Sequence, residues 1–192
     1  MTDSREAALW HRGLRGDAEA FGALFDLHRD RVFRHAFRIL QNHADAEDAT
    51  AVSFLELWRR HTHVRVVNGS VLPWLLVTVT NASRNLRRSR ARYWRLLEAL
   101  PREDSVPSAE EIAFVRAELS PELGAALKTL GSRDAQLLSL VALEGYQIAD
   151  AAAALGLTPG AARTRLHRVR TRLQHSLGHD TLASYLTQEA IT

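Results

Sequence analysis

The sequence contains no cysteine, which excludes a disulfide framework, a thiol nucleophile and any cysteine-ligated metal centre. It also lacks a run of about 18 apolar residues, the length that a membrane-spanning helix needs. The first ten residues, MTDSREAALW, carry acidic side chains where a secretory signal would have a basic region followed by a long apolar core. We therefore expect no membrane insertion and a location in the cytoplasm.

Lysine is also scarce, because Lys128 is the one basic residue that is not arginine or histidine. Arginine suits bidentate contacts with phosphate and guanine, although a GC-rich genome would give the same bias. The charge is unevenly distributed: residues 1–95 carry a net charge of +6, residues 96–121 one of −4 and residues 122–192 one of +1. Two basic regions separated by an acidic one predict two modules that face a polyanion.

Features of an active site are scarce. The nine histidines are scattered, and the close pair His61 and His63 lies at alternate positions that do not share a helix face. There is no glycine-rich phosphate loop and no serine in a nucleophile elbow. The acidic cluster Asp45, Glu47 and Asp48 fits the first turn of a helix, where carboxylates complement the helix dipole. We therefore predict no enzymatic activity, no metal site and no cofactor.

Two amphipathic helices are predicted in the first third of the chain. Apolar residues recur at three- and four-residue spacing over Asp17–Leu40, and Asn42 interrupts the pattern. A second amphipathic run extends from about residue 44 to residue 60 and carries the apolar stripe Val52, Leu55 and Trp58.

A turn and a third helix follow. Asn68-Gly69 is a turn signal, and Pro73 suits the first turn of a helix. The β-branched residues of Trp74–Thr80 (WLLVTVT) would suit a strand as well as a helix. Because the segment continues without a breaker to Leu97, its length favours a helix.

The far end of this third helix, Arg84–Arg95, contains six arginines and no acid. Such a run is either a solvated helix face or a binding surface. The interleaved Leu86, Tyr93 and Trp94 favour a binding surface.

Residues 98–121 are acidic and punctuated by proline, which predicts a linker between two domains, with a short helix around Ala109–Leu119 as an option. After it, Ser132 is expected to cap a helix that runs to about Glu144 and stops at Gly145. On that helix Leu137, Leu138 and Val141 are expected to point inward.

The last helices form a helix-turn-helix pattern. A short helix, Gln147–Leu155, is followed by a turn through Gly156. Thr158 is the expected cap of a second helix that runs through Leu173, with Pro159 in its first turn. Its arginine-rich part spans about 14 Å at roughly 1.5 Å per residue, which suits a DNA major groove. Four residues of the second helix form a core stripe: Ala162, Leu166, Val169 and Leu173.

Four segments, taken in order, resemble RNA polymerase sigma factors of the extracytoplasmic-function (ECF) group. They are DAEAFGALFDLHRDRVFRHAFRIL, DAEDATAVSFLELW, LPWLLVTVTNASRNLRR and, after the acidic linker, LEGYQIADAAAALGLTPGAARTRLHRVRTRL. The resemblance implies an all-α protein with two small helical domains. It assigns residues 1–97 to a region-2-like domain for polymerase binding and promoter melting, 98–121 to the linker, 122–178 to a region-4-like helix-turn-helix domain and 179–192 to a tail.

The resemblance also assigns site residues. Polymerase contacts are expected at Asp45, Glu47, Asp48, Phe54, Leu55 and Trp58. The family commonly continues the DAED motif with an apolar pair and Gln-Glu, whereas this chain has Ala49, Thr50, Ala51 and Val52, so some polar clamp contacts are absent or replaced. Minus-ten recognition and melting are expected at Trp74, Asn81, Arg84, Asn85, Arg87 and Arg88, with Asn81 matching the residue that captures an unstacked base. Contacts with the upstream, minus-thirty-five element are expected at Arg163, Thr164, Arg165, His167, Arg168 and Arg170.

The predicted function is a sigma factor that binds core RNA polymerase and directs it to promoter DNA. Control is expected from a separate protein such as an anti-sigma factor, or from the level of expression. The alternative is a helix-turn-helix regulator that binds DNA without serving as a polymerase subunit.

Overall fold

The computed structural model describes residues 2–98 and 121–177, and it divides the chain into two compact units, residues 1–115 and 116–192. Among the described residues every regular element is helical, as predicted, and none of these helices is long and apolar enough to cross a bilayer. Most of the expected linker, the optional helix at 109–119 and the tail fall outside the described residues.

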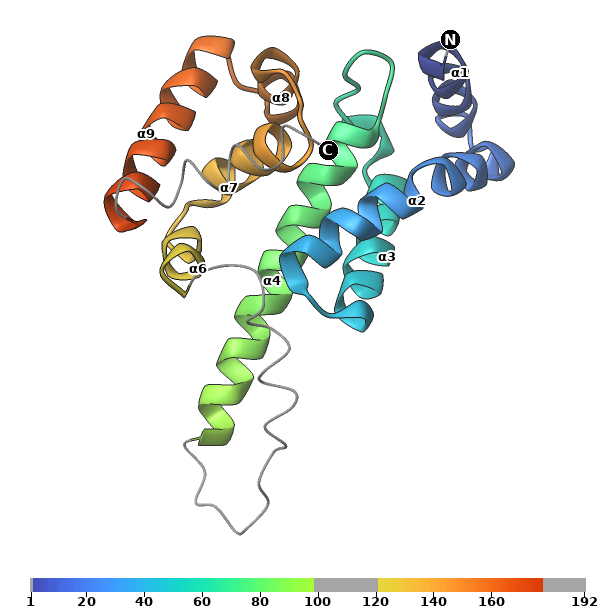
Figure 1. The fold of residues 1–192 in the computed structure, drawn as a ribbon. Helices are drawn as coiled ribbons and strands as arrows, with labels where there is room; N and C mark the ends of the chain where they lie inside the picture. The colour runs from blue at the N-terminus through green and yellow to red at the C-terminus, as the bar shows by residue number, and fades with distance from the viewer. Residues whose placement is uncertain (1, 99–120, 178–192) are drawn as a thin grey trace. The chain divides into compact units, whose positions relative to one another are not determined.

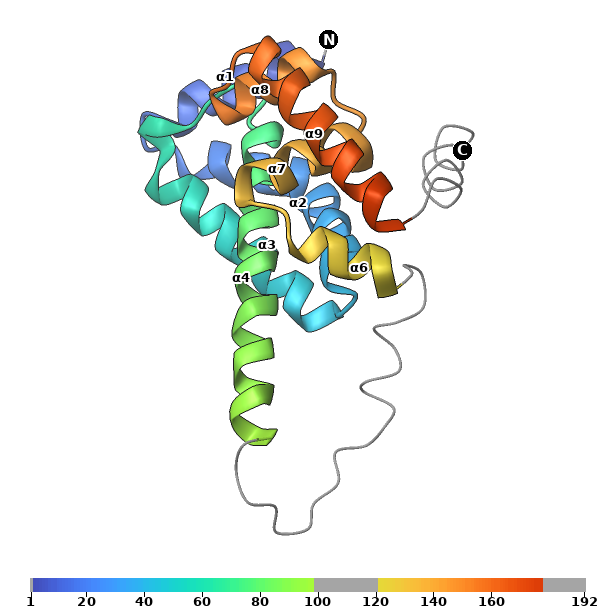
Figure 2. The same cartoon turned by 90° about the vertical axis from the view of Figure 1, so that its left-hand side faces the viewer.

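The first unit contains α1 (Thr2–Gly13), α2 (Ala18–Leu40), α3 (His43–Arg59), a 3-10 turn (His61–His63) and α4 (Leu72–Glu98). Helices α2, α3 and α4 each pack against the other two, and α1 packs against α2 (Figures 1 and 2). The core between them is formed by fully buried side chains that include Leu24, Val32, Leu57, Leu75 and Leu76. The segment WLLVTVT is therefore helical, as its length predicted, with three of its apolar residues turned inward.

The ends of α2 and α3 follow from polar capping residues. The Asp17 carboxylate accepts a hydrogen bond from Ala20 N at 3.0 Å, and the Asn42 side chain accepts one from Asp45 N at 2.9 Å. Between the two helices Gln41 takes a left-handed conformation with φ of 51°. The predicted starts of both helices are confirmed to within a residue.

A two-residue hairpin precedes α4. Val67 and Ser70 exchange two backbone hydrogen bonds of 3.0 Å, and the residues between them, Asn68 and Gly69, have φ of 50° and 75°. Positive φ at both central positions is the requirement of a type I′ turn, which asparagine and glycine meet at low cost. The turn predicted from Asn68-Gly69 is confirmed.

The apolar stripe of α3 lies on its exposed side, although a stripe of this kind ordinarily faces the core. Val52, Leu55 and Trp58 are 46%, 56% and 46% exposed. The inward face is instead built largely from small and polar residues. Thr50 and Ser53 are both buried there because each hydroxyl donates to the backbone carbonyl four residues earlier, at 2.7 Å.

The second unit contains α6 (Pro121–Lys128), α7 (Ser132–Leu138), a π-helical turn (Ser139–Leu143), α8 (Ile148–Leu155) and α9 (Pro159–Leu177). Helix α9 contacts α6, α7 and α8, and Figure 2 shows it running beside them. One buried cluster joins α6 to α9 and consists of Leu123, Ala126, Leu130, Val169 and Leu173. Neither α6 nor α1 was predicted from the sequence.

The predicted helix from Ser132 to Glu144 is wrong in its details. Gly131, and not Ser132, occupies the capping position, and no side chain caps the helix. After Leu138 the helix widens into the π-turn, where Glu144 N bonds to Ser139 O at 3.2 Å. The π-turn holds one more residue than a regular helical turn and so rotates the side chains that follow. Leu140 is buried, at 1% exposure, whereas Val141, which was expected to point inward, is only half-buried. Gly145 ends this segment with φ of 69°, as predicted.

Candidate functional site

Helices α8 and α9 form the helix-turn-helix that the sequence predicts. Gly156 ends α8 with φ of 64°, a conformation that glycine adopts without strain. The Thr158 hydroxyl then accepts a hydrogen bond from Ala161 N at 3.2 Å and caps α9, as predicted. The four residues of the expected core stripe of α9 are all buried, between 0% and 4% exposed: Ala162, Leu166, Val169 and Leu173.

The opposite side of α9 carries the predicted upstream-element residues. Arg163, Thr164, His167 and Arg168 are all exposed, and Arg170 is exposed beside them. The Thr164 hydroxyl donates a hydrogen bond to Gly160 O at 3.1 Å. This bond to the helix backbone orients the methyl group of Thr164. This side of α9 is rich in hydrogen-bond donors, as a protein surface that contacts phosphate and guanine must be.

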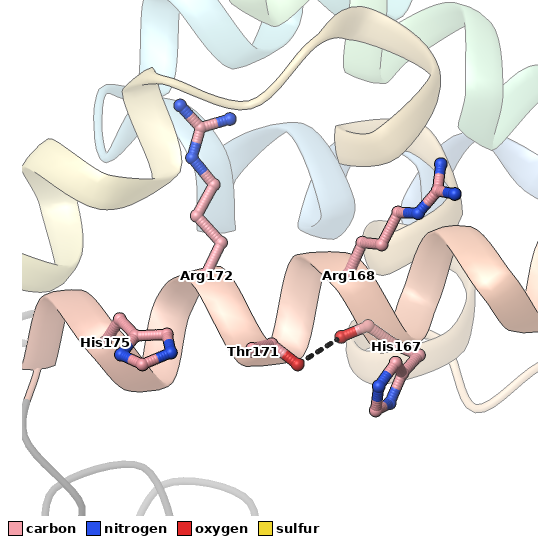
Figure 3. Close-up of a pocket in the computed structure, with 5 residues that line it drawn as sticks. All are labelled: His167, Arg168, Thr171, Arg172 and His175. Carbon is pink, nitrogen blue, oxygen red and sulfur yellow. Dashed lines mark hydrogen bonds between the residues drawn. The ribbon is translucent and has the colours of Figure 1, made fainter.

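An open hollow extends this surface toward the end of α9. Figure 3 shows Arg168 and Arg172 projecting to the same side of the helix, with His167, Thr171 and His175 forming a row along it. The Thr171 hydroxyl donates to His167 O at 3.0 Å. Thr171 and Arg172 lie four residues after the predicted contacts His167 and Arg168, and His175 lies four residues after Thr171, so all three continue the same face, although the sequence analysis did not include them.

Arg165, one of the residues expected at the upstream element, pairs with an acidic residue inside the second unit. Its Nη1 donates to Oδ1 of Asp134 on α7 at 2.8 Å, and the two side chains are 39% and 30% exposed. A guanidinium that pairs with a carboxylate of its own unit has part of its charge neutralised and one of its donors occupied, which leaves less for a phosphate group. Arg165 therefore fastens α9 to α7, and Arg170 is the better candidate for a phosphate contact.

Helix α4 brings together most of the residues expected to act at the minus-ten element. Trp74, Asn81, Asn85 and Arg88 follow one another at spacings of seven, four and three residues, so they lie along one face of the helix. Trp74 and Asn81 are half-buried, whereas Asn85 and Arg88 are exposed. The face thus combines an aromatic ring, two amides and a cation.

Arg84 and Arg87 flank this face. Partial burial of Arg84 lowers its pKa from the ordinary value, and the neighbouring charges of Arg88 and Arg87 lower it further. Nη1 of Arg87 donates to Ile39 O at the end of α2 at 3.5 Å. Several like charges within two turns repel one another, so an anion placed over this part of α4 would be attracted strongly.

The residues expected to contact polymerase divide into an internal and an exposed group. Asp45 is buried, and its Oδ2 lies 2.6 Å from Nη1 of Arg90, while Phe54 is 6% exposed and packs edge-on against Phe25 at 4.8 Å. Glu47 and Asp48 are exposed, as are Leu55 and Trp58. We call the exposed apolar stripe Val52, Leu55 and Trp58 the α3 patch. In the described residues no cluster of histidines and carboxylates could hold a metal ion.

Comparisons with known proteins give the class. Residues 24–93 match the model of Sigma-70 region 2, and residues 120–173 match that of Sigma-70, region 4. The chain is 32% identical over 167 residues to the ECF RNA polymerase sigma factor SigE of Mycolicibacterium smegmatis, covering 85% of this chain and 62% of that protein. It is 31% identical over 175 residues to SigM of Mycobacterium tuberculosis, covering 91% and 85%.

Solved structures agree on the fold. The structure of CnrH in complex with the cytosolic domain of CnrY superimposes with a TM-score of 0.58 at 21% identity, covering 92% of this chain and 99% of that one. RpoE of Bartonella quintana, in complex with the anti-sigma factor NepR, gives a TM-score of 0.50 at 22% identity, covering 85% and 99%. These structures share the fold, and the two family models identify the chain as a sigma factor, a class of transcription proteins. The chain belongs to the ECF group of the sigma-70 family, whose members direct RNA polymerase in transcription initiation.

Proposed function

We propose that this sigma factor acts in the cytoplasm and divides promoter recognition between two domains, residues 1–97 in the first unit and residues 122–178 in the second, which the 98–121 linker joins. The first unit would bind core polymerase through α3 and open DNA at the minus-ten element with α4. The second would read the minus-thirty-five element with α9. The observation that carries the proposal is the exposed, arginine-rich side of α9, opposite the buried stripe of a helix-turn-helix.

The α3 patch supports a protein-binding role for the first unit. Its three large side chains are each about half exposed, although a side chain of that size gains about 1.5–3 kcal/mol from full burial. Glu47 and Asp48 lie in the first turns of the same helix and are exposed, so the patch has an acidic neighbour. An apolar stripe with a charged rim is the composition of a protein interface, and we assign it to core polymerase.

The face of α4 supports capture of unpaired bases. An aromatic ring such as that of Trp74 stacks on a base, and the Asn81 amide can pair with the hydrogen-bonding edge of a flipped base. Arg88, and Arg84 at the flank, would hold the adjacent phosphates. Opening the duplex needs no bond chemistry, because the free energy of these contacts offsets the cost of unpairing. We therefore propose that the protein has no enzymatic activity and no cofactor.

The main argument for the alternative, a regulator that is not a polymerase subunit, is the departure from the family pattern at residues 49–52. Ala49 and Thr50 are buried in the first unit at 0% and 7% exposure. Substitutions at those two positions therefore alter internal packing and leave the outer surface of α3 to Ala51 and Val52. This supports a polymerase interface of changed composition over the loss of the interface.

We also propose that a separate anti-sigma protein controls this chain. The RpoE structure, whose fold this chain shares, contains the anti-sigma factor NepR, and CnrH, of the same fold, was likewise solved in complex with a second protein, the cytosolic domain of CnrY. The α3 patch is the surface we assign to that partner in competition with polymerase.

Run-off transcription with core polymerase on genomic fragments tests the proposed function. We expect specific transcripts that depend on the protein, together with its retention on immobilised core polymerase. A regulator would bind some fragments as duplex but would leave core polymerase unable to start at defined positions. Transcripts from core polymerase alone, and from core polymerase with a variant that lacks residues 122–177, serve as controls.

A further inference from the structure

Glu6 of α1 lies where three segments meet, and it is 5% exposed. Its Oε1 accepts hydrogen bonds from Nε2 of His28 on α2 at 2.8 Å, from the backbone N of Val71 at 2.8 Å and from Oγ of Ser70 at 2.9 Å. A carboxylate oxygen only accepts, so the hydrogen of each contact belongs to the partner. One buried oxygen therefore connects α1, α2 and the segment that leads into α4.

The carboxylate is held in its charged form. Burial by itself raises the pKa of Glu6, but the hydrogen bonds from His28, Val71 and Ser70, together with the attraction of His28, bring the pKa below its ordinary value. A neutral acid would lose part of each of these contacts, because hydrogen bonds to a charged group are about twice as strong as neutral ones.

These contacts form the cap of α4. The first N–H groups of a helix have no partner within the helix. Here Val71 N donates to Glu6, and Leu72 N donates to Ser70 Oγ at 3.1 Å, which itself donates to Glu6. The negative charge at this end also complements the dipole of α4. Glu6 thus caps a helix that begins 66 residues later in the sequence.

The capped segment adjoins the proposed minus-ten site. The hairpin Val67–Ser70 leads directly into α4, and Trp74 is the third residue of that helix. Asn81 lies two turns further along the same face. Any shift or fraying of the first turn of α4 therefore moves Trp74 relative to Asn81.

We propose that Glu6 is a positioning residue for base recognition at the minus-ten element: it fixes the hairpin and the first turn of α4 so that Trp74 and Asn81 present one fixed geometry to unpaired bases. The inference rests on the proposed function. It also lies beyond the matched region-2 segment, which starts at residue 24 and excludes α1.

The test compares Glu6→Ala, Glu6→Gln and Ser70→Ala in holoenzyme, on a promoter chosen from the run-off experiment and on variants with each minus-ten base changed. Permanganate reactivity of thymines measures opening. The control is Leu40→Ala. Leu40 is 7% exposed, so this substitution leaves a cavity, and it lies about 18 Å along α2 from His28. All variants are compared at equal folded fraction, measured by tryptophan fluorescence, because all four tryptophans lie in the first unit.

We expect Glu6→Ala to lower opening of the preferred promoter about tenfold, as the loss of a charged hydrogen bond allows, and to reduce discrimination between base variants. Glu6→Gln, whose amide oxygen still accepts from Val71 and Ser70, should fall between wild type and Glu6→Ala. Leu40→Ala should leave the ratio between base variants unchanged. If Glu6→Ala does not fold, Glu6→Gln and Ser70→Ala carry the same test.

The inference is overturned if the Glu6 and Ser70 variants lower opening on all base variants by one common factor, as Leu40→Ala does. That result would assign Glu6 to folding alone. Failure of the proposed function has a different signature, because wild-type protein would then give no specific transcript with core polymerase.

Discussion

Oδ2 of Asp45 lies 2.6 Å from Nη1 of Arg90, and this ion pair joins the first turn of α3 to the basic end of α4. The Asp45 side chain is 10% exposed and that of Arg90 is 54% exposed. The helix that we assign to polymerase binding and the helix that we assign to DNA opening are therefore linked by a charge pair whose acid is largely buried. A displacement of either helix would strain the pair.

The coupling between Asp45 and Arg90 should exceed that of an ordinary surface pair. We expect a double-mutant cycle with Asp45→Ala and Arg90→Ala to give about 1 kcal/mol in the free energy of unfolding, because the carboxylate is shielded from water. The control is Glu56 with Arg59 on α3, a pair at 3.4 Å whose side chains are 23% and 66% exposed, for which we expect less than about 0.5 kcal/mol. Equal coupling in urea unfolding of both pairs would contradict the link.

The α3 patch should be needed for polymerase binding. Leu55→Glu places a charge in the middle of the patch and should weaken retention on core polymerase at least about tenfold, since the loss of a buried leucine contact and the added desolvation both act against binding. Leu27→Glu on α2 is the control, because Leu27 is also exposed, at 45%, but lies outside the patch. Fluorescence anisotropy of labelled protein with core polymerase measures both affinities, and a similar loss in the two variants would remove the patch from the interface.

Asn81→Ala should lower promoter opening while leaving upstream duplex binding nearly intact. Of the DNA, the amide is proposed to contact only an unpaired base, so its loss should leave the contacts of α9 unchanged. Permanganate footprinting measures opening, and an electrophoretic shift with a minus-thirty-five duplex measures binding. Unchanged thymine reactivity with normal transcription would remove Asn81 from the site.

The arginines of α9 should separate into three roles. Arg168→Ala should cost about 1–3 kcal/mol in binding and relax preference at one base pair, if it pairs with guanine. Arg170→Ala should weaken binding to all DNA sequences alike. It should also reduce the slope of the logarithm of the binding constant against the logarithm of the salt concentration, which we call the salt slope, by about one unit. Arg165→Ala should act mainly by loosening α9 from α7, because it removes the 2.8 Å contact with Asp134.

Titrations of the three α9 variants against a selected site, its single-base variants and a range of salt concentrations separate these roles. An Asp134→Ala variant, which breaks the same internal pair from the other side, should reproduce the effect of Arg165→Ala. If Arg165→Ala lowers the salt slope and Asp134→Ala does not, then Arg165 contacts phosphate after all.

Acid should destabilise the first unit through Glu6. The pKa of Glu6 is lower in the folded protein than its ordinary value of 4.5. Its stabilising contribution is therefore complete above that value and is lost as the pH falls through the lower, folded-state pKa. Urea unfolding followed by tryptophan fluorescence between neutral pH and about pH 3 measures this, and the fall should be shallower in Glu6→Gln.

A second carboxyl contributes in the same direction and provides the comparison. The hydrogen bond from Ala20 N lowers the pKa of Asp17, and Arg12 lowers it further. Asp17→Asn should therefore also flatten the pH dependence, although the Asp17 side chain is 31% exposed, which makes the effect smaller than that of the more deeply buried Glu6. Identical pH profiles for wild type and Glu6→Gln would show that Glu6 does not carry the acid sensitivity.

Local signals in the sequence determined where the helices begin and turn. Asp17, Asn42, Asn68-Gly69, Gly156 and Thr158 each act on backbone within a few residues, so each feature could be predicted from the printed sequence. The exposed side of α9 was also predictable, since its arginines alternate with a buried stripe at helical spacing.

Features that depend on distant partners could not be predicted. The bond between Arg165 and Asp134 spans 31 residues, and that between Glu6 and Val71 spans 65. Which face of α3 is buried could not be predicted from its pattern of apolar residues. Thr50 and Ser53 can be buried because their hydroxyls form hydrogen bonds within the helix, while larger apolar residues face outward. The π-turn at Ser139–Leu143 altered a register that a regular helical period would have set differently.

The hydrogen bonds of Glu6 determine where the chain can be truncated without exposing unsatisfied polar groups. A fragment trimmed to the region-2 match would begin at residue 24 and would lack α1. The fragment would then have no acceptor for the hydrogen bonds that His28, Ser70 and Val71 donate to Glu6. It would also expose to water the residues that pack against Trp10, which is only 4% exposed in the whole unit. A fragment intended for crystallography or for binding single-stranded DNA should therefore retain Thr2–Gly13, and a bulky fusion partner is better attached at the other end of the chain.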